Sequence, residues 1–578
     1  MRRSMTRPEL PDNVTLYTDT EQFFSRVINE ENTLGDAVIS FEMTDEGSLK
    51  VYVTGGQSPI RFLKLRWRYY WNGAYRFLGD AWERGYGDLE WRGLSAGRFM
   101  PWYFCASNEY EGMDPDRTEH RCFGVKTGPN ALCFWQADGA GVTLFMDLRN
   151  GGRGAWLEGR RLMAANVVRC AYGHCRAFEA LKLFLKDLAK RPVFPDFPVY
   201  GSNNWYYAYG VSTQKEILKD TDYLVSLTEG LQNRPFMVID DCWQEDHVAD
   251  GYNGGPWTQG NQYFPDMKGL AAQIAAKGVR PGIWVRLLQN HDPAIPAECR
   301  LLPHYARQEH TAVSELAGQD QAERLRLQEA SDLLDPTHPA AMEQIRSDVR
   351  RICEWGYKLI KHDFSTYDLF GRWGWNMHPL MTADGWHFYD RTLTSAEVVK
   401  LFYSNIFEVC KEYGTLVLGC NTIGHLGVGL MHLNRTGEDT SGRCWENTRR
   451  HGINTLAFRL PQHKVFYDVD ADCVGIDGSI DWKLNRQWAI LLAESGTPFF
   501  VSVKPGVLNR SEKQELSDLM KTASRQKVHL IPEDWMNTDC PAVWLDEDNG
   551  VMRDFQWYEK TGVEFDPDAF RSTPYLSK

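Results

Sequence analysis

Two aspartates, each following a basic residue at short spacing, are the side chains best suited to nucleophilic and acid–base chemistry. Asp363 ends the segment Y-K-L-I-K-H-D, two residues after Lys361, and Asp439 ends the segment R-T-G-E-D, four residues after Arg435. A carboxylate beside a lysine has a depressed pKa and stays anionic, so Asp363 could attack a carbon centre. Asp439 could then donate a proton and later act as a base, if its pKa is the higher of the two.

Two residues near Asp439 bear on this assignment. Glu438 is a rival proton donor, since neighbouring side chains diverge and only one of the pair can face a reacting bond. Arg435 would oppose a raised pKa of Asp439 if the two side chains touched. We therefore expect Arg435 to point at the substrate instead.

A repeated pattern from Val199 onwards predicts the elements that bring the two aspartates together. Apolar segments of strand length, polar loops and amphipathic helical segments alternate there. Eight candidate strands begin near residues 199, 235, 281, 357, 415, 430, 464 and 498. Eight such units favour an α/β fold of the (β/α)8 TIM barrel type over an open doubly wound sheet, which usually has fewer strands. Only Ile423–Gly429 separates the fifth and sixth strands, so we expect a short helix there or none.

Polar residues and tryptophans collect where these strands end, which in a barrel is the rim that carries chemistry. They are Asn203, Asn204, Trp205, Asp240, Asp241, Trp243, Lys361, Asp363, Cys420, Asn421, Arg435, Asp439, Asp468, Asp470 and Asp472. A single aspartate at a strand end is more often a helix cap. Here, however, six strand ends carry such polar residues, which helix capping explains less well. Carboxylates and basic groups hold hydroxyls by charge-assisted hydrogen bonds, and a tryptophan ring covers an apolar face. The rim therefore predicts a sugar site.

The flanking segments predict two smaller units. Residues 1–190 are β-rich with Gly and Pro turns, which is typical of an antiparallel sandwich, and they end in an amphipathic helical segment. The segment R-P-V-F-P-D-F-P then marks a boundary. We expect an N-terminal β-sandwich domain with a linker helix at 1–190, the catalytic barrel at 191–503, and a small C-terminal helix with a β segment at 504–578.

Composition narrows the function classes. The formal charge of −13 disfavours nucleic acid, and no run of about 18 apolar residues predicts a membrane span. The 13 cysteines are odd in number and lie in apolar runs, which indicates reduced, buried thiols. Cys170 and Cys175, with His174 between them, have no second pair to complete a zinc site, and no glycine-rich phosphate loop is present, so we expect no metal and no cofactor. No signal peptide is seen, which predicts a cytoplasmic protein, or a periplasmic or secreted one if a signal has been removed.

Several motifs in order resemble glycoside hydrolase clan D, which contains the α-galactosidases and relatives of families 27 and 36. L-L-D-P-T-H-P-A-A-M-E-Q-I followed by Y-K-L-I-K-H-D-F resembles the approach to the nucleophile. F-M-V-I-D-D-C-W resembles the Asp-Asp-Gly-Trp strand end, and N-R-T-G-E-D-T-S resembles the Arg-x-x-x-Asp segment of the acid/base. The resemblance covers roughly residues 199–503 and is closer to family 36, which also has an N-terminal β-sandwich.

The resemblance implies a role for each matching residue. Asp363 would be the nucleophile and Asp439 the acid/base. The remaining matches would form the sugar pocket: Asp240, Asp241 and Lys361 on hydroxyls, Trp205 and Trp243 as walls, and Cys420 and Arg435 near the 2-substituent. Asn421, at the same strand end as Cys420, is a further candidate for binding the substrate.

Three departures from the pattern leave the sugar open. Cys242 stands where the clan has Gly, V-R-L-L-Q-N replaces a Glu-Pro-Glu segment, and His362 replaces an aromatic residue. The expected function is a retaining exo-acting α-glycosidase of the α-galactosidase type, acting on an oligosaccharide or glycoconjugate. The alternatives are an α-N-acetylgalactosaminidase, a β-L-arabinopyranosidase or a transglycosidase on the same scaffold, and a non-catalytic carbohydrate-binding barrel. The sequence does not decide whether the chain forms a homo-oligomer.

Overall fold

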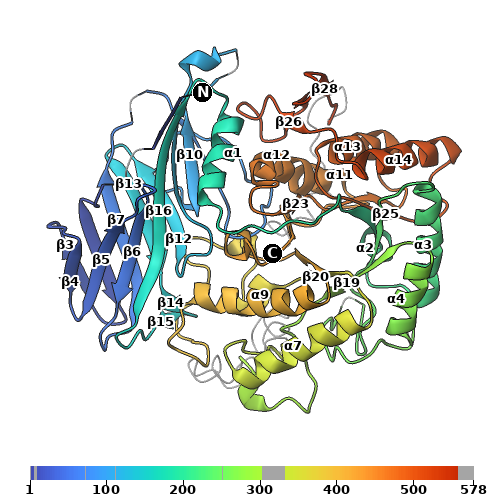
Figure 1. The fold of residues 1–578 in the computed structure, drawn as a ribbon, viewed down its shortest axis with the longest axis horizontal. Helices are drawn as coiled ribbons and strands as arrows, with labels where there is room; N and C mark the ends of the chain where they lie inside the picture. The colour runs from blue at the N-terminus through green and yellow to red at the C-terminus, as the bar shows by residue number, and fades with distance from the viewer. Residues whose placement is uncertain are drawn as a thin grey trace, which may run out of the picture.

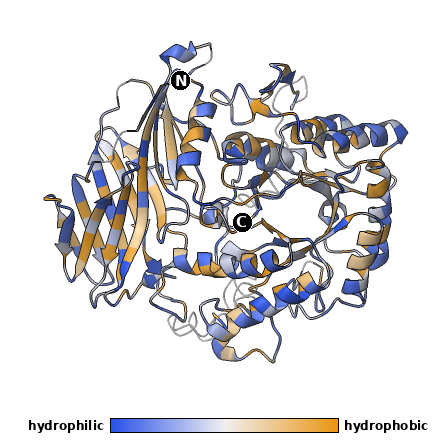
Figure 2. Ribbon diagram, viewed as in Figure 1, coloured by the Kyte–Doolittle hydropathy of each residue, from blue (hydrophilic) through white to orange (hydrophobic). Residues whose placement is uncertain are grey.

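Two layered antiparallel sheets lie beside a barrel of parallel strands in the computed structural model of the chain (Figure 1). The structure describes residues 2–5, 9–71, 73–110, 112–249, 251–301 and 332–557. Hydrophobic and hydrophilic residues alternate along the strands of the layered sheets, and the helices around the barrel contain residues of both kinds (Figure 2).

The layered sheets form the expected β-sandwich, because alternate residues of their strands are buried. In β6 (Leu49–Thr54), for example, Leu49, Val51 and Val53 are buried while the residues between them are half-buried. One sheet has the order β4 (Glu31–Leu34), β5 (Ala37–Met43), β6, β16 (Arg161–Gly173), β11 (Glu119–Val125), β10 (Tyr103–Ser107) and β8 (Arg76–Gly79), with β1 (Arg2–Met5) paired to β16. The other has the order β3 (Gln22–Ser25), β2 (Asn13–Thr18), β7 (Ile60–Arg68), β13 (Gly141–Asp147), β12 (Leu132–Asp138) and β9 (Met100–Pro101).

A parallel sheet curls into the barrel that the sequence predicts. Its order is β23 (Asp468–Asp470), β22 (Leu433–Arg435), β21 (Leu416–Gly419), β20 (Leu359–His362), β19 (Arg280–Val285), β18 (Phe236–Ile239), β17 (Tyr200–Asn203), β25 (Phe499–Val503) and β24 (Cys473–Ile476). The seventh predicted strand, which begins near residue 464, is present only as the short β23, and a further strand, β24, follows after Ala471 and Asp472, where Asp472 has φ of 75°. The Asp472 carboxylate accepts hydrogen bonds from Thr440 N–H at 2.9 Å, so the break ties the barrel to the segment after Asp439.

Helices cover the outside of the barrel, where the sequence predicts amphipathic helical segments. They include α3 (Gln214–Leu227), α4 (Met267–Ala276), α7 (Pro339–Glu354), α9 (Ser395–Glu412) and α13 (Trp482–Glu494) (Figure 1). Between β21 and β22 lies only α10 (Gly424–Gly427), which confirms the expectation of a short helix there. After β22 the chain forms α11 (Trp445–Asn447), a π-helix at Thr448–Asn454 and α12 (Thr455–Arg459).

One helix lies between the sandwich and the barrel in sequence, and a helix with a small sheet follows the barrel. Helix α1 (Ala177–Leu188) follows the sandwich and buries Phe178, Leu181, Phe184 and Leu188, as its spacing predicts. After the barrel come α14 (Arg510–Ala523) and a three-stranded sheet of β26 (Leu530–Pro532), β27 (Val543–Asp546) and β28 (Met552–Asp554). The Trp535 ring contacts Phe458 of α12 at 5.6 Å and Phe178 of α1 at 5.5 Å.

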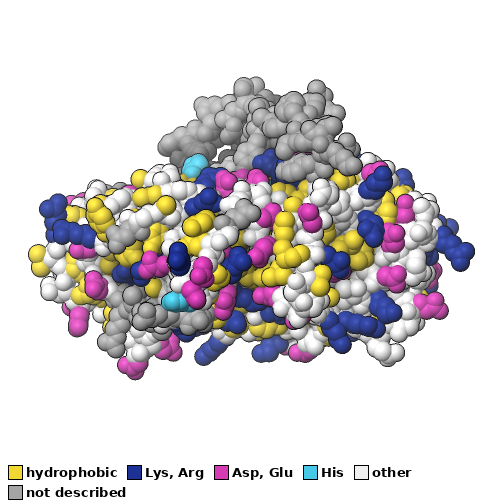
Figure 3. All heavy atoms as spheres, turned by 90° about the horizontal axis from the view of Figure 1, so that it is seen from above, with side chains coloured by type: hydrophobic (Ala, Val, Ile, Leu, Met, Phe, Trp, Pro, Cys, Tyr) yellow, Lys and Arg dark blue, Asp and Glu magenta, His cyan; other side chains and the backbone are white. Residues whose placement is uncertain are grey.

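Other features bear on the predicted chemistry. All 13 cysteines lie within the described residues and are free, and all but Cys444 are buried, which confirms the expectation of reduced thiols. Acidic and basic side chains are interspersed over the face shown in Figure 3. Among the residues that the structure describes, no helix is both long enough and apolar enough to cross a membrane. Within the described ranges, no group of three or more His, Cys, Asp or Glu side chains is arranged to hold a metal ion.

Candidate active site

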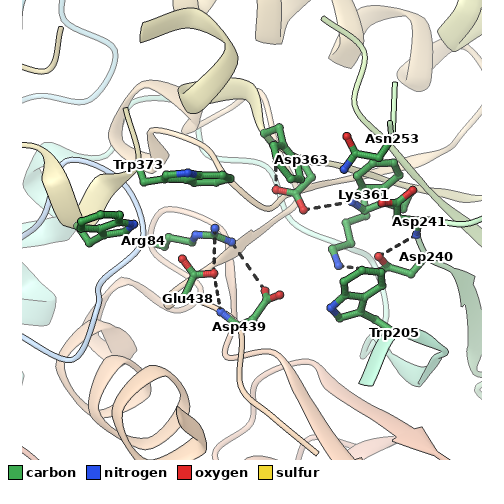
Figure 4. A pocket seen from close by; sticks show the side chains of 13 residues that line it. Arg84, Trp205, Asp240, Asp241, Asn253, Lys361, Asp363, Trp373, Glu438 and Asp439 are labelled. Carbon is green, nitrogen blue, oxygen red and sulfur yellow. Dashed lines mark hydrogen bonds and ion pairs between the residues drawn. The ribbon is translucent and has the colours of Figure 1, made fainter. Parts of the chain in front are cut away.

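A cavity of about 320 Å³ opens among the carboxyl ends of the barrel strands (Figure 4). Six of the predicted site residues line it: Asp363, Asp439, Asp240, Asp241, Lys361 and Trp205. The other lining residues are Arg84, Asn253, Trp284, Phe364, Trp373, Trp375 and Glu438. The two aspartates that are 76 positions apart in sequence therefore face the same space.

Asp363 follows β20 directly and is held by hydrogen bonds from three segments. Its Oδ1 accepts from the N–H of Phe364 at 2.7 Å and from the N–H of Asn421 at 3.2 Å. Its Oδ2 accepts from Trp284 Nε1 at 3.1 Å. Phe364 has φ of 60°, a conformation that a bulky side chain adopts only when its surroundings impose it. These contacts fix the direction in which the carboxylate points.

The surroundings of Asp363 keep it ionised. Burial alone raises the pKa of Asp363, but the charges of Arg84 and Lys361 and the hydrogen bond from Trp284 outweigh burial and lower the pKa to about 2. The carboxylate is thus anionic over the whole physiological range, as a nucleophile requires.

Asp240 and Lys361 form a buried ion pair close to Asp363. Asp240 follows β18, and its Oδ2 accepts from Lys361 Nζ at 2.8 Å and from Asn203 Nδ2 at 2.6 Å. Asn204 Oδ1 accepts from the Asp240 N–H at 2.8 Å. Burial lowers the pKa of Lys361, but the Asp240 charge overcomes this and raises it well above the usual value. Lys361 is therefore a permanent cation at the base of the cavity.

Asp241 is oriented by a histidine. Its Oδ1 accepts from Gln244 Nε2 at 2.7 Å and lies 3.2 Å from His247 Nδ1. His247 Nε2 lies 2.9 Å from the Gly210 carbonyl oxygen, which can only accept, so Nε2 carries a hydrogen. Burial lowers the pKa of His247, but the hydrogen bond and charge of Asp241 outweigh it and raise the pKa.

Arg84 reaches the cavity from the β-sandwich, on the segment between β8 and β9. This segment pairs with the barrel loop: the Gly85 N–H donates to Thr436 O at 2.8 Å, and the Glu438 N–H donates to Gly85 O at 3.1 Å. Arg84 Nη2 lies 3.1 Å from Glu438 Oε1, and its Nη1 lies 3.9 Å from Asp439 Oδ1 (Figure 4). The sandwich therefore supplies a cation to the site of the barrel.

Arg435 contacts Asp439, so the expectation that it points at the substrate is wrong. Its Nη2 lies 3.2 Å from Asp439 Oδ1 and 2.9 Å from Asp472 Oδ2, and its side chain is buried outside the lining of the cavity. The Asp472 carboxylate at the strand break draws the guanidinium away from the cavity and under the Asp439 loop.

The two adjacent carboxyl groups, Asp439 and Glu438, differ in the direction in which their pKa values shift. Burial raises the pKa of Asp439, but Arg435, Arg84 and Lys361 outweigh it and lower the pKa. For Glu438, burial and the neighbouring Asp439 charge raise the pKa against the opposing charge of Arg84. The expectation that Asp439 holds the raised pKa is therefore wrong in this structure. The more exposed carboxyl group is nevertheless Asp439, with 42% of its side chain accessible against 20% for Glu438.

Aromatic rings from several segments wall the cavity. Trp205 begins α2 (Trp205–Ala208), and Trp284 lies in β19. Trp373 stacks on Tyr367 with ring centroids 4.4 Å apart, and it also contacts the edge of Phe364 at 5.2 Å. Flat rings opposite charged groups suit a ligand with one apolar and one polar face, such as a sugar.

Besides Arg435, three predicted site residues lie behind the cavity and do not line it. Trp243 was expected as a wall, but it is completely buried and its Nε1 donates to Trp284 O at 2.9 Å. Cys420 lies under the site, with its Sγ 3.4 Å from Arg435 Nη1. Asn421 holds Asp363 through its backbone N–H. Trp243 and Asn421 therefore position the residues that do face the cavity.

Two of the three sequence departures have a structural role. Arg286, in V-R-L-L-Q-N, donates to Asn253 Oδ1 at 2.6 Å and to Asp368 Oδ1 at 2.6 Å, and its guanidinium lies 4.2 Å from the Phe364 ring centroid. It therefore orients Asn253 and Phe364, which both line the cavity. His362 is buried, and burial lowers its pKa to about 4, so it is a neutral core residue.

Sequence reasoning missed Arg84, Asn253 and Trp373 because none of them lies at a strand end of the barrel. The segment A-W-E-R-G-Y-G-D-L-E-W-R-G, which contains Arg84, is rich in charged, aromatic and glycine residues between two strands. Such a composition is a signal of a functional loop, although it does not say which site the loop reaches.

Replacing Arg84 by methionine is expected to move the acidic side of the pH–activity profile to higher pH. Arg84 lowers the pKa of Asp363 and of Asp439, so its removal raises both, and protonation then begins at higher pH. A shift of about one pH unit is the expected size for loss of one nearby cation. The measurement is kcat/KM against pH, with the exposed Arg92→Met as the matched control. An unchanged profile in Arg84→Met would show that Arg84 does not act on the ionised groups.

No protein-family sequence model matches the chain, and neither does any curated protein sequence. Solved structures do match. An α-galactosidase from Thermus thermophilus in complex with p-nitrophenyl α-D-galactopyranoside aligns over 93% of this chain and 98% of its own, with a TM-score of 0.54 and 16% identity. The chain has the fold of the family 36 α-galactosidases.

Two further structures share this family 36 fold. The GH36 α-galactosidase AgaA of Geobacillus stearothermophilus aligns over 95% of this chain and 77% of its own, with a TM-score of 0.56 and 15% identity. The galactosidase domain of the α-galactosidase–sucrose kinase AgaSK aligns over 94% of this chain and 75% of its own, with a TM-score of 0.54 and 15% identity. The sandwich beside the barrel is part of this shared fold.

Proposed function

We propose that the protein is a retaining exo-acting α-glycosidase of the α-galactosidase type, with Asp363 as nucleophile and Asp439 as acid/base. The observation that carries the proposal is one cavity lined by an ionised carboxylate and, from another loop, by a pair of carboxyl groups that differ in pKa. Cleavage of a glycosidic bond by double displacement needs one charged and one protonated carboxyl group on opposite sides of the bond.

The proposed substrate is an oligosaccharide or glycoconjugate that ends in a galactose-like ring. Asp240, Asp241 and Lys361 gather on one side of the cavity, with Trp205 near them (Figure 4). In this position the charged groups would hold the hydroxyls of the terminal ring, while the rings of Trp205 and Trp284 would cover its apolar surface. Solved structures with the same fold are α-galactosidases, and three of them contain stachyose or raffinose, which supports galactose as the sugar.

The reaction would proceed in two displacements at the anomeric carbon. Asp363 attacks this carbon as the glycosidic bond breaks, and a covalent glycosyl-enzyme forms. The acid/base gives its proton to the leaving oxygen in the first step and takes a proton from water in the second. Water then attacks from the face that the leaving group occupied, so the product keeps the configuration of the substrate.

Asp439 is the proposed acid/base because its side chain is the more accessible of the pair and points into the cavity, while Glu438 faces Arg84 (Figure 4). Charge on Asp363 raises the pKa of Asp439. Glu438 is the second candidate, because its pKa is raised and it therefore holds a proton more readily in this structure. Both carboxyl groups line the cavity, so the choice between them rests on the leaving-group experiment described below.

A panel of p-nitrophenyl glycosides tests the activity and the sugar together. We expect α-galactoside to be hydrolysed with the highest kcat/KM, with the α-anomer of galactose as the first product seen by proton NMR. A higher kcat/KM for the α-N-acetylgalactosaminide or the β-L-arabinopyranoside would move the protein to that alternative, and glycosyl transfer in preference to hydrolysis would make it a transglycosidase. Binding of galactose without turnover of any glycoside, unchanged in Asp363→Asn, would instead support a non-catalytic binding barrel.

A further inference from the structure

Glu83 is a buried carboxylate at the junction of the β-sandwich and the barrel, and the chemistry proposed so far gives it no role. It lies on the segment between β8 and β9, directly before Arg84, and only 2% of its surface is exposed. Burying a carboxylate is costly unless hydrogen bonds satisfy its oxygens. The partners of Glu83 therefore indicate what the side chain does.

Glu83 accepts hydrogen bonds from its own segment and from two loops of the barrel. Its Oε1 accepts from Tyr86 OH at 2.8 Å and from Gly374 N–H at 2.7 Å, and its Oε2 accepts from Asn421 Nδ2. Gly374 follows Trp373, which lines the active-site cavity, and Glu83 and Tyr86 leave no room for a Cβ at this glycine. These partners are donors, so the ionised form of Glu83 is the form that they fit.

Asn421 connects Glu83 to Asp363. The Tyr367 N–H donates to Asn421 Oδ1 at 3.0 Å, which leaves Nδ2 as the atom that faces Glu83. The Asn421 carbonyl oxygen accepts from Thr366 N–H at 3.1 Å, and the Asn421 N–H donates to Asp363 Oδ1 at 3.2 Å. A side chain of the sandwich thus holds the residue that holds the Asp363 carboxylate.

Stability does not explain why a carboxylate lies at this position. Burial raises the pKa of Glu83 to about 7, and the charge of Glu438 adds to the rise, while the charge of Arg84 and the hydrogen bond from Tyr86 oppose it. Because folding raises this pKa, the folded state loses stability as the pH rises from the usual pKa of a glutamate through about 7. The ionised side chain therefore opposes folding, and its contacts with Asn421 and the loop after Trp373 remain as its contribution.

We propose that Glu83 is a positioning residue for the reaction: through Asn421 it fixes the direction of the Asp363 carboxylate, so the β-sandwich takes part in assembling the active site of the barrel. The proposal rests on the glycosidase function proposed above and adds a residue of another domain to it. A nucleophile must be aligned with the carbon that it attacks, and a displacement of about 1 Å can lower the rate by about 10²-fold. The hydrogen bond between Glu83 and Asn421 prevents such a displacement.

Exchanging the carboxylate and the amide between the two positions tests this hydrogen bond. In Glu83→Gln two amide groups would face each other through their NH2 groups, because the oxygen of the new amide is still needed by Tyr86 and Gly374. In Asn421→Asp two carboxylates would face each other. In the double variant Glu83→Gln/Asn421→Asp the amide at position 83 donates to the carboxylate at position 421, which restores the hydrogen bond in the reverse direction. The carboxylate at position 421 can still accept from the Tyr367 N–H.

Each single variant is expected to lower kcat for p-nitrophenyl α-galactoside about 10–100-fold with little change in KM, because the groups proposed to bind the sugar stay in place. The double variant should have a higher kcat than either single variant. Rates are measured above pH 7, where Glu83 is ionised, and are expressed per folded molecule, with the folded fraction taken from circular dichroism. A residue that only stabilised the fold would change this fraction and leave kcat per folded molecule unchanged.

Glu397→Gln is the matched control, because Glu397 also joins the two domains but lies away from the cavity. Its carboxylate accepts from Arg160 Nη1 at 2.7 Å and Nη2 at 2.9 Å, and the variant should have the wild-type kcat. A wild-type kcat in either single variant at positions 83 and 421 would overturn the proposal, as would a double variant no more active than the single variants. A wild-type protein that hydrolyses no glycoside is a different outcome, since it removes the glycosidase function and this inference with it.

Discussion

Asp363→Gly is expected to lose at least about 10⁴-fold in kcat/KM for the α-galactoside, because the atom that attacks the anomeric carbon is removed. Glycine also leaves a space where the carboxylate was. Azide is small enough to enter this space and can replace the nucleophile in a single displacement. It would attack from the face that Asp363 occupied, so the product would be β-galactosyl azide, with its configuration inverted. Activity with and without azide, together with proton NMR of the azide product, checks both expectations.

The same substitution at a distant position controls for a general effect of glycine. Asp45 lies in an exposed turn of the β-sandwich, and Asp45→Gly should hydrolyse the α-galactoside at the wild-type rate and give no azide product. Substantial activity in Asp363→Gly without azide would remove Asp363 from the reaction. Production of α-galactosyl azide by Asp363→Gly would mean that another residue forms the covalent intermediate.

Asp439→Asn is expected to lose activity in proportion to how much the leaving group needs a proton. Melibiose releases glucose through one of its poorly acidic hydroxyl groups, so its kcat/KM should fall by about 10²–10⁴-fold, the usual contribution of a general acid. A 2,4-dinitrophenyl galactoside releases an acidic phenol and should lose much less in the first step. Azide should accelerate the variant by attacking the glycosyl-enzyme, and the product would be α-galactosyl azide, with its configuration retained. The configuration of the azide product thus separates the role of Asp439 from that of Asp363.

Glu438→Gln is the matched variant for this prediction, because it removes the neighbouring carboxyl group from the same loop. Its loss should be similar for melibiose and for the dinitrophenyl galactoside, and azide should not accelerate it. Because the pKa of Glu438 is raised, Glu438 is the alternative proton donor, and the two variants would then behave the other way round. Leaving-group dependence and azide acceleration in Glu438→Gln, with neither in Asp439→Asn, would move the acid/base role to Glu438.

The fold could be predicted from the sequence because its signals are periodic and local. Apolar segments alternate with amphipathic helices, and in a parallel barrel this order alone brings all the strand ends to one rim. The break between β23 and β24 could not be read in this way. It depends on Asp472, whose contacts with Thr440 and Arg435 come from a loop more than 30 residues earlier in the chain.

The site could be predicted in part, and the residues that were missed show why. Asp240, Lys361 and Asp363 lie at or just after their strand ends, so topology places them together. Trp243 lies only two residues beyond Asp241, but the chain has left the strand there and the ring turns into the core towards Trp284. Arg84 comes from the sandwich, and no spacing rule relates it to a carboxyl group more than 350 positions later.

The expectation of a raised pKa for Asp439 was wrong for a related reason. The sequence shows that Arg435 lies four residues before Asp439, but it does not show whether the two side chains meet. Asp472 decides this, because its carboxylate fixes the Arg435 guanidinium under the loop, where it also reaches Asp439. Arg84 adds a second positive charge from the sandwich. The order of the two pKa values therefore depends on contacts that only the folded chain brings together.

The most direct measurement of the central claim is to trap the covalent intermediate. A 5-fluoro-α-galactosyl fluoride forms a glycosyl-enzyme that is hydrolysed slowly, and mass spectrometry of the digested protein then identifies the labelled side chain. The expected result is one galactosyl label on Asp363, absent when galactose is added in excess as a competitor. A label on another carboxylate, or rapid turnover of an α-galactoside to β-galactose with no label at all, would contradict a double displacement through Asp363.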